Sequence, residues 1–115
     1  MSETAQCLFC RIARGEIPAK VVYETPELLA FRDIDPKAPT HVLAIPRQHI
    51  ATLNDVKDPG LIGRLVMAAA DVARREGLSD RGYRAVINTN PDGGQTVFHL
   101  HVHVLGGRHM TWPPG

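Results

Sequence analysis

Residues 99–104 alternate strictly between histidine and an aliphatic residue, in the order His-Leu-His-Val-His-Val. Because successive side chains of a β-strand point to opposite faces, a strand here would place His99, His101 and His103 on one face and the aliphatic side chains on the other. Same-face neighbours lie about 6.6 Å apart, so the three imidazoles can surround one phosphate-sized group. Imidazole titrates near neutral pH and serves as nucleophile, acid, base or metal ligand. The alternation therefore predicts a strand whose aliphatic face packs in the core and whose other face carries the three histidines.

The composition is that of one ordinary globular domain. The chain has 115 residues, of which 43% are hydrophobic and 22% are charged, and its formal net charge is +1. That balance argues against a nucleic-acid partner, because binding to phosphate backbones needs a basic surplus. The first six residues lack the apolar core of a signal peptide, and no apolar run is long enough for a membrane span. We therefore expect a cytoplasmic protein with neither a membrane nor a nucleic acid as partner.

We expect a single α+β domain over residues 1–115, with a flexible N-terminus at 1–6 and a C-terminal tail at 108–115. A long helix is expected to start at Asp58-Pro59, where an N-cap residue precedes proline, and to end near Gly77. Its apolar stripe comprises Leu61, Ile62, Leu65, Val66, Ala69, Val72 and Ala73. A short helix is expected at 7–14, and strands at 21–23, 28–31, 41–45, 83–87 and 97–105. The pattern predicts a five-stranded antiparallel sheet with the long helix between strands three and four.

The turn-rich loop 88–96 leads directly into the histidine segment. Its paired glycines, Gly93 and Gly94, permit backbone conformations that bring N–H groups close to an anion, and Thr96 adds a hydroxyl donor. An ordinary hairpin turn would have the same composition. Next to the histidines, the loop is a candidate phosphate cradle.

The two cysteines, Cys7 and Cys10, have the spacing C-x-x-C. This spacing suits a metal clip or a redox dithiol better than a disulfide framework. Nothing around the pair indicates the βαβ context of a redox dithiol, and two buried thiols without metal are the remaining alternative.

The run 92–108, DGGQTVFHLHVHVLGGR, resembles the signature of the histidine triad (HIT) superfamily. The Leu-Gly-Gly-Arg ending and the terminal residues 112–115, Trp-Pro-Pro-Gly, resemble the Hint branch, the purine nucleoside phosphoramidases. Further similar segments lie at 16–20, 31–34, 38–41 and 45–49. The resemblance covers nearly all of the chain after Ala5 and implies a HIT-like fold.

The resemblance implies a hydrolase that cleaves the P–N bond of purine nucleoside 5′-phosphoramidates. His101 would attack the phosphorus and form a nucleotidyl-histidine, which water then hydrolyses. His103 would donate to phosphate oxygens, with His41 as its neighbour. The proton for the departing amine would come from His99, if that residue is free of metal, or from a water relayed through His103.

The resemblance also implies a ligand set, a nucleotide site and a partner. Cys7, Cys10, His49 and His99 would hold a structural zinc, as in many bacterial relatives, and no catalytic cofactor is expected. The protein would be a homodimer whose tail, with Trp112, reaches the other subunit's active site. The implied nucleotide-binding residues are Phe9, Ile12, Ile17, Phe31, Asp33, Ile34, Asn88, Gly94, Gln95, Thr96, His101, His103 and Trp112.

Two other functions fit the same residues. Relatives with the same histidine nucleophile hydrolyse dinucleoside polyphosphates or transfer nucleotidyl groups. A nucleotide-sensing or scaffold module, in which zinc and sheet are purely structural, is an alternative of a different class. Its expected mark, loss of the central histidine, is absent here because His101 is present.

Overall fold

The structure, a computed structural model, describes residues 3–115. The helices are α1 Glu3–Gln6, α2 Leu8–Ala13 and α3 Pro59–Arg75, the strands are β1 Val21–Glu24, β2 Leu28–Arg32, β3 Thr40–Pro46, β4 Tyr83–Val86 and β5 Val102–Gly106, and the short 3-10 turns are η1 Leu53–Asp55 and η2 Pro91–Gly93. Within residues 3–115 five strands form one antiparallel sheet in the order β1-β2-β3-β5-β4. This confirms the predicted α+β fold. Of the segment 1–6 expected to be flexible, residues 1 and 2 lie outside the described residues and the rest form α1.

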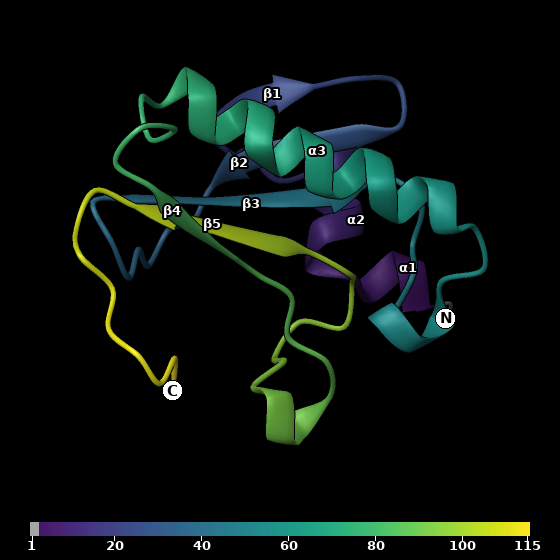
Figure 1. Cartoon of the computed structure of the whole chain (residues 1–115). Coiled ribbons are helices and arrows are strands. Elements are labelled where there is room, and N and C mark those ends of the chain that lie inside the picture. The colour runs from purple at the N-terminus through teal and green to yellow at the C-terminus, as the bar shows by residue number, and fades with distance from the viewer. Residues whose placement is uncertain (1–2) are drawn as a thin grey trace.

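The sheet has a helix on each side, and Figure 1 shows α3 lying along one face and α2 on the other. The larger core lies between α3 and the sheet, and includes Leu65, Val72, Leu100, Val102 and Val104. A smaller core on the α2 side holds Phe9, Leu29, Phe31, Leu43 and Ile45. None of the helices within residues 3–115 has the length and apolar character needed to cross a bilayer.

The last strand is shorter than predicted, because it begins at Val102 instead of residue 97. In the β3–β5 register Ala44 lies opposite Val102, so Pro46 would fall opposite Leu100. Proline has no N–H to donate, and the ladder stops there. The predicted alternation of faces nevertheless persists through the whole segment, since Leu100, Val102 and Val104 all pack in the α3-side core.

Helix α3 begins and ends as its sequence predicts. The Asp58 carboxylate caps it by accepting a hydrogen bond from the Gly60 N–H at 2.9 Å, and Pro59 is its first residue. Gly77 follows the helix with a φ of 76°, a left-handed conformation that favours glycine. The predicted stripe is buried at most positions, but Val66 is 40% exposed, and Ala68, outside the predicted stripe, is buried.

The contribution of the Asp58 N-cap to the stability of α3 can be tested by substitution. Replacing Asp58 with alanine leaves the first amides of α3 without their side-chain acceptor, so we expect a loss of about 1 kcal/mol in the free energy of unfolding. Urea denaturation measures it. Asp71→Ala is the matched control, because that carboxylate pairs with Arg74 on the same helix, as Asp58 pairs with Arg64, but it does not cap the helix. Its loss should cost a few tenths of a kcal/mol. Equal losses in both variants would contradict the capping role.

Candidate active site and metal centre

His101 is held in one tautomer by the peptide group two residues before it. Its Nδ1 lies 2.7 Å from the carbonyl oxygen of His99, which can only accept, so Nδ1 carries the proton. In the neutral ring Nε2 then keeps its lone pair. Burial lowers the pKa of His101, which favours the neutral form. The ring therefore keeps an unprotonated Nε2, which is the form that a nucleophilic imidazole requires.

His103 is oriented by His41, and the two rings have opposite roles in one chain of hydrogen bonds. The Lys37 N–H donates to His41 Nδ1 at 3.0 Å, so the proton of the neutral His41 ring is on Nε2. That Nε2 donates to His103 Nδ1 at 2.9 Å, and His103 therefore carries its proton on Nε2. His103 thus presents an N–H donor, the group needed to bind a phosphate oxygen.

Burial and the neighbouring His101 and His41 lower the pKa of His103 to about 4. Protonation would put an N–H at Nδ1, facing the N–H of His41. An unfolded histidine titrates near pH 6.5, so between that pH and about pH 4 the unfolded chain binds a proton that the folded His103 does not. This contribution to stability is present above pH 6.5 and is lost as the pH falls through the folded pKa.

We therefore expect His103→Asn to flatten the fall in the free energy of unfolding between pH 6.5 and about pH 4. The slope lost should be below the roughly 1.4 kcal/mol per pH unit of one full proton, because the half-buried ring keeps part of its hydration. Urea titrations of wild type and variant at several pH values measure it. Parallel pH profiles of the two proteins would contradict the assignment.

The loop 88–96 is stabilised by its own hydrogen bonds. The amide of Gly94 donates to the Pro91 carbonyl and that of Gln95 to the Asn90 carbonyl, at 2.9 and 3.1 Å. The Gln95 side chain is buried and bridges Asn90, Ala51 and Val97. The predicted phosphate contacts of Gly94 and Gln95 would need these bonds to open, whereas the exposed Thr96 offers its hydroxyl without such a change.

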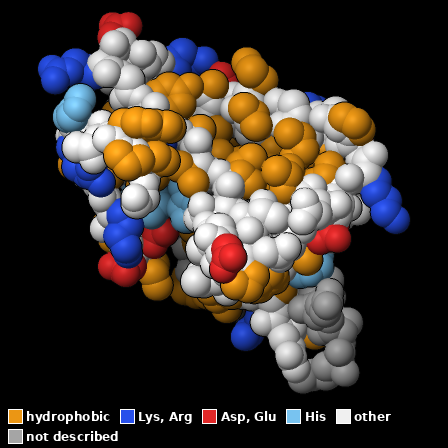
Figure 2. Space-filling model, turned by 60° about the horizontal axis from the view of Figure 1, so that its bottom comes forward, with side chains coloured by type: hydrophobic (Ala, Val, Ile, Leu, Met, Phe, Trp, Pro, Cys, Tyr) orange, Lys and Arg blue, Asp and Glu red, His pale blue; other side chains and the backbone are white. Residues whose placement is uncertain are grey.

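Two cavities flank the pair His41 and His103. One, of about 500 Å³, is lined by both histidines, three cationic side chains and part of the tail. Its lining residues are Lys37, His41, Arg84, Val86, Asn88, Gly93, His103, Leu105, Arg108, Met110, Pro114 and Gly115. The other, of about 530 Å³, is lined by Pro18, Ala19, Lys20, Arg32, Asp33 and Ile34. Asp33 connects them, because its Oδ2 lies 3.5 Å from His41 Nε2. Figure 2 shows histidine side chains recessed on this face between charged side chains of both signs.

The other seven predicted nucleotide-binding residues fall into three groups. Asp33 and Ile34 line the second cavity, and Ile34 is 99% exposed. Phe9 and Phe31 are buried in the α2-side core and pack edge to face, with 5.4 Å between ring centroids, while Ile12 and Ile17 are half-buried. Trp112 is 82% exposed on the tail.

Sequence reasoning missed the cationic lining of the first cavity. Arg84 and Val86 pair with Leu105 and His103 across the β4–β5 ladder, so they share the face of the histidine row. Pairing the predicted strand at 83–87 with the histidine segment would have placed Arg84 on the same face as the histidines.

Cys7, Cys10, His49 and His99 form a second cluster, in which one ligand atom from each residue lies within 4.8 Å of the others. His99 Nδ1 lies 3.3 Å from Cys7 Sγ and 3.4 Å from Cys10 Sγ, and His49 Nδ1 lies 3.3 Å from Cys10 Sγ. Four donors held tetrahedrally at about 2.0–2.3 Å from one Zn²⁺ are about 3.3–3.8 Å apart. His99 Nε2 donates to the Pro46 carbonyl at 2.8 Å, which leaves the Nδ1 lone pair for a metal. The residues therefore fit a structural zinc, as predicted.

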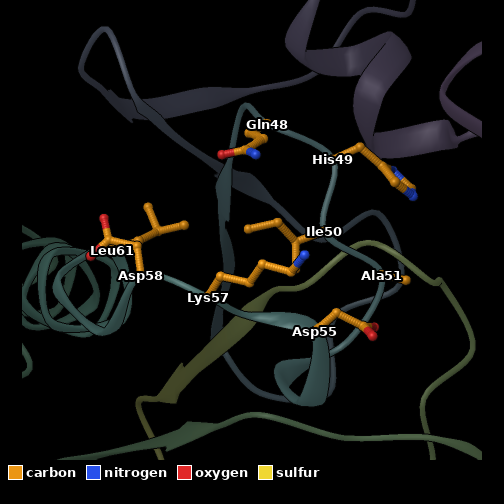
Figure 3. A pocket seen from close by; sticks show the side chains of 8 residues that line it. All are labelled: Gln48, His49, Ile50, Ala51, Asp55, Lys57, Asp58 and Leu61. Carbon is orange, nitrogen blue, oxygen red and sulfur yellow. The ribbon is translucent and has the colours of Figure 1, made fainter.

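A further cavity, of about 550 Å³, lies between the end of β3 and the start of α3 and is not lined by His103. His101 is 7% exposed and lines neither this cavity nor the two described above, so its ring lies beside the His103 cavity and not in its wall. Figure 3 shows His49 at the edge of the cavity between β3 and α3, with the ring directed away from the other lining side chains. The ring instead contacts Cys10 of the metal cluster. This cavity is thus separate from the chemistry described above.

Fold and site together define a histidine-row protein with a Cys₂His₂ cluster, and comparison with known proteins gives its family. The HIT domain model matches residues 14–110, and the chain belongs to this family. It is 48% identical over 105 residues to a purine nucleoside phosphoramidase of Escherichia coli, covering 90% of this chain and 88% of that protein. It is 50% identical over 112 residues to a 14 kDa zinc-binding protein of Zea mays, covering 94% and 87%.

A crystal structure of a HIT family hydrolase from Legionella pneumophila superposes with a TM-score of 0.92 at 59% identity, covering 95% of this chain and 99% of that one. The predicted superfamily is thereby confirmed, and the chain is a homologue of HIT hydrolases.

Proposed function

We propose that this protein hydrolyses the P–N bond of purine nucleoside 5′-phosphoramidates through a nucleotidyl-histidine on His101. The supporting observation is the 2.7 Å hydrogen bond from His101 Nδ1 to the His99 carbonyl, which leaves Nε2 unprotonated. The 48% identity to a purine nucleoside phosphoramidase supports the substrate class.

In the first step His101 Nε2 attacks the phosphorus, a bond forms between them, and the bond from phosphorus to the amine nitrogen breaks. His101 keeps its Nδ1 proton throughout, because the His99 carbonyl accepts it. The N–H of His103, together with the Thr96 hydroxyl, stabilises the charge on the phosphoryl oxygens. Asn88, which lines the same cavity as His103, would contact the phosphate or its ester oxygen.

The departing amine takes a proton, and the geometry favours a water relayed through His103 as its source over His99. Both ring nitrogens of His99 are engaged elsewhere, one with the cysteines and one with Pro46. In the second step water attacks the phosphorus and the bond to His101 Nε2 breaks, which releases the nucleoside monophosphate and restores the neutral imidazole. The proton that this water loses returns through His103 and replaces the one taken by the amine.

The nucleoside would occupy the cavity at Asp33 and Ile34. The Asp33 carboxylate would accept hydrogen bonds from the ribose hydroxyls, and Ile34 would cover the purine, with Ile12 and Ile17 nearby. Phe9 and Phe31 would support this surface from below, since both are buried. The tail residues that line the first cavity would contact the leaving group. Trp112, which is exposed on the same tail, would reach the active site of the other subunit.

We also propose that Cys7, Cys10, His49 and His99 hold a structural zinc. The four donors form a set found in structural zinc sites, and the Zea mays relative is named as a zinc-binding protein. Bound zinc would supply a cross-link between α2, the segment after β3 and the segment before β5. Both cysteines are free thiols, which suits the reducing cytoplasm that we propose as the protein's location.

The protein would act as a homodimer. β4 lies at one end of the sheet, and the exposed hydrophobic side chains include Tyr83 on β4 and Val66 and Met67 on α3. An unpaired edge beside exposed apolar side chains favours pairing with another chain. Sedimentation velocity at micromolar concentration tests this: the mass of two chains would support it and a monomer would contradict it.

Parallel rate measurements test the proposed activity. We expect cleavage of an adenosine 5′-phosphoramidate of lysine to be much faster than cleavage of a diadenosine polyphosphate. The reverse order would assign the chain to polyphosphate hydrolysis or nucleotidyl transfer. Binding of purine nucleotides with no cleavage of either compound would assign it to nucleotide sensing.

A further inference from the structure

His99 belongs to the metal cluster and to the nucleophile's surroundings at the same time. Its side chain is fully buried, with Nδ1 against the two cysteine sulfurs and Nε2 donating to the Pro46 carbonyl. Its own carbonyl accepts the proton of His101 Nδ1 at 2.7 Å. The carbonyl of His99 therefore selects the tautomer of His101, and the side chain of the same residue is held by the metal cluster.

A second contact runs from the cluster to the nucleophile through Phe9. This residue lies between Cys7 and Cys10 on α2, a helix of only six residues. Its ring meets the His101 ring nearly edge on, with centroids 5.1 Å apart and an interplanar angle of 84°, and lies 6.0 Å from the His99 ring. The C-x-x-C clip therefore places an aromatic wall against the imidazole of His101.

We propose that the cluster of Cys7, Cys10, His49 and His99 positions the nucleophile, with His99 as the positioning residue. This proposal rests on the proposed function, because it takes His101 as the nucleophile. When the four residues hold a metal, which we call the closed cluster, the His99 carbonyl and the Phe9 ring keep His101 in the tautomer that has an unprotonated Nε2. The open cluster is the same set of residues without a metal. With the cluster open, both constraints loosen, and His101 also populates the tautomer that carries its proton on Nε2 and cannot attack phosphorus.

The second histidine pair provides an internal reference. His41 is fixed by the Lys37 amide and donates to His103, so the tautomers of both rings are set by hydrogen bonds outside the cluster, although the His103 ring centroid lies 4.9 Å from that of His101. Opening the cluster should therefore change the tautomer of His101 and leave those of His41 and His103 unchanged. A cavity of about 400 Å³ lined in part by Cys7 and His49 gives a chelator access to the cluster.

The test is ¹⁵N NMR of histidine-labelled protein, in which the two ring nitrogens report the tautomer directly. Wild type loaded with Zn²⁺ is compared with chelated wild type, His49→Ala, which removes a ligand, and His49→Cys, which restores a Cys₃His set. Leu78→Ala is the control, because it opens a cavity in the α3-side core away from the cluster. The same samples are measured for the rate of nucleotidyl-histidine formation.

We expect one His101 tautomer in zinc-loaded wild type, His49→Cys and Leu78→Ala, and a mixture after chelation or in His49→Ala. The rate of adduct formation should fall about tenfold in the latter two, with KM within about twofold of wild type. If the metal-free protein does not fold, replacing Zn²⁺ with the larger Cd²⁺ should move the signals of both His99 and His101.

A His101 spectrum that stays unchanged when the metal is removed or exchanged, while His99 responds, would overturn the proposal even in an enzyme that forms the adduct. Absence of any adduct on His101 in zinc-loaded wild type would instead overturn the proposed function, and with it the positioning role.

Discussion

Replacing His101 with alanine is expected to lower kcat/KM for a purine nucleoside 5′-phosphoramidate by at least about 10³-fold. The variant loses the nitrogen that attacks phosphorus, and neither neighbouring histidine can replace it. His103 presents an N–H toward the substrate, and His99 has both ring nitrogens engaged with the cysteines and with Pro46. Steady-state release of the amine measures the loss.

The matched control is His109→Ala, which removes an exposed histidine of the tail. It should keep activity within about twofold of wild type, because no step assigned above uses that ring. Circular dichroism should give the same spectrum for both variants and wild type. An H101A enzyme that turns over within tenfold of wild type would remove His101 from the nucleophile's role.

The second large effect concerns the metal cluster. We expect Cys10→Ala to lower the free energy of unfolding by more than about 3 kcal/mol in the presence of Zn²⁺, or roughly 10 °C or more in Tm. Without zinc, Cys10 is a buried thiol whose pKa is raised to about 11 by burial and by the neighbouring Cys7. The four ligands come together only in the folded chain. The free energy of metal binding therefore adds to the free energy of unfolding.

Calorimetry with and without a chelator measures this contribution. Chelation should lower the Tm of wild type toward that of Cys10→Ala and leave the variant almost unchanged, and elemental analysis should find about one zinc per wild-type chain. Identical melting curves for wild type with and without chelator, together with no bound zinc, would contradict a structural metal.

The sequence predicts the layers of this fold because its strongest patterns are local. The helical period between Asp58 and Gly77 defines α3 and its cap, and the alternation at 99–104 assigns side chains to faces even where no strand forms. The C-x-x-C pair predicts a ligand set that the structure brings together, although its two histidine members follow from the resemblance and not from spacing.

Other features depend on contacts between distant segments and are not visible in a local pattern. The early end of the β3–β5 ladder comes from Pro46 falling opposite Leu100, which requires the strand register. The loop expected to offer its amides to a phosphate uses those of Gly94 and Gln95 internally. The hydrogen bonds from Lys37 through His41 to His103 likewise join two strands, and only the folded sheet defines their direction.

The most direct test of the account is a single turnover with enzyme in excess, quenched in alkali and analysed by mass spectrometry of the peptides. We predict a transient adduct that adds the mass of one nucleoside monophosphate less one water, carried by His101 and formed as fast as the amine is released. Amine release without such an adduct, or an adduct on another residue, would contradict the proposed mechanism.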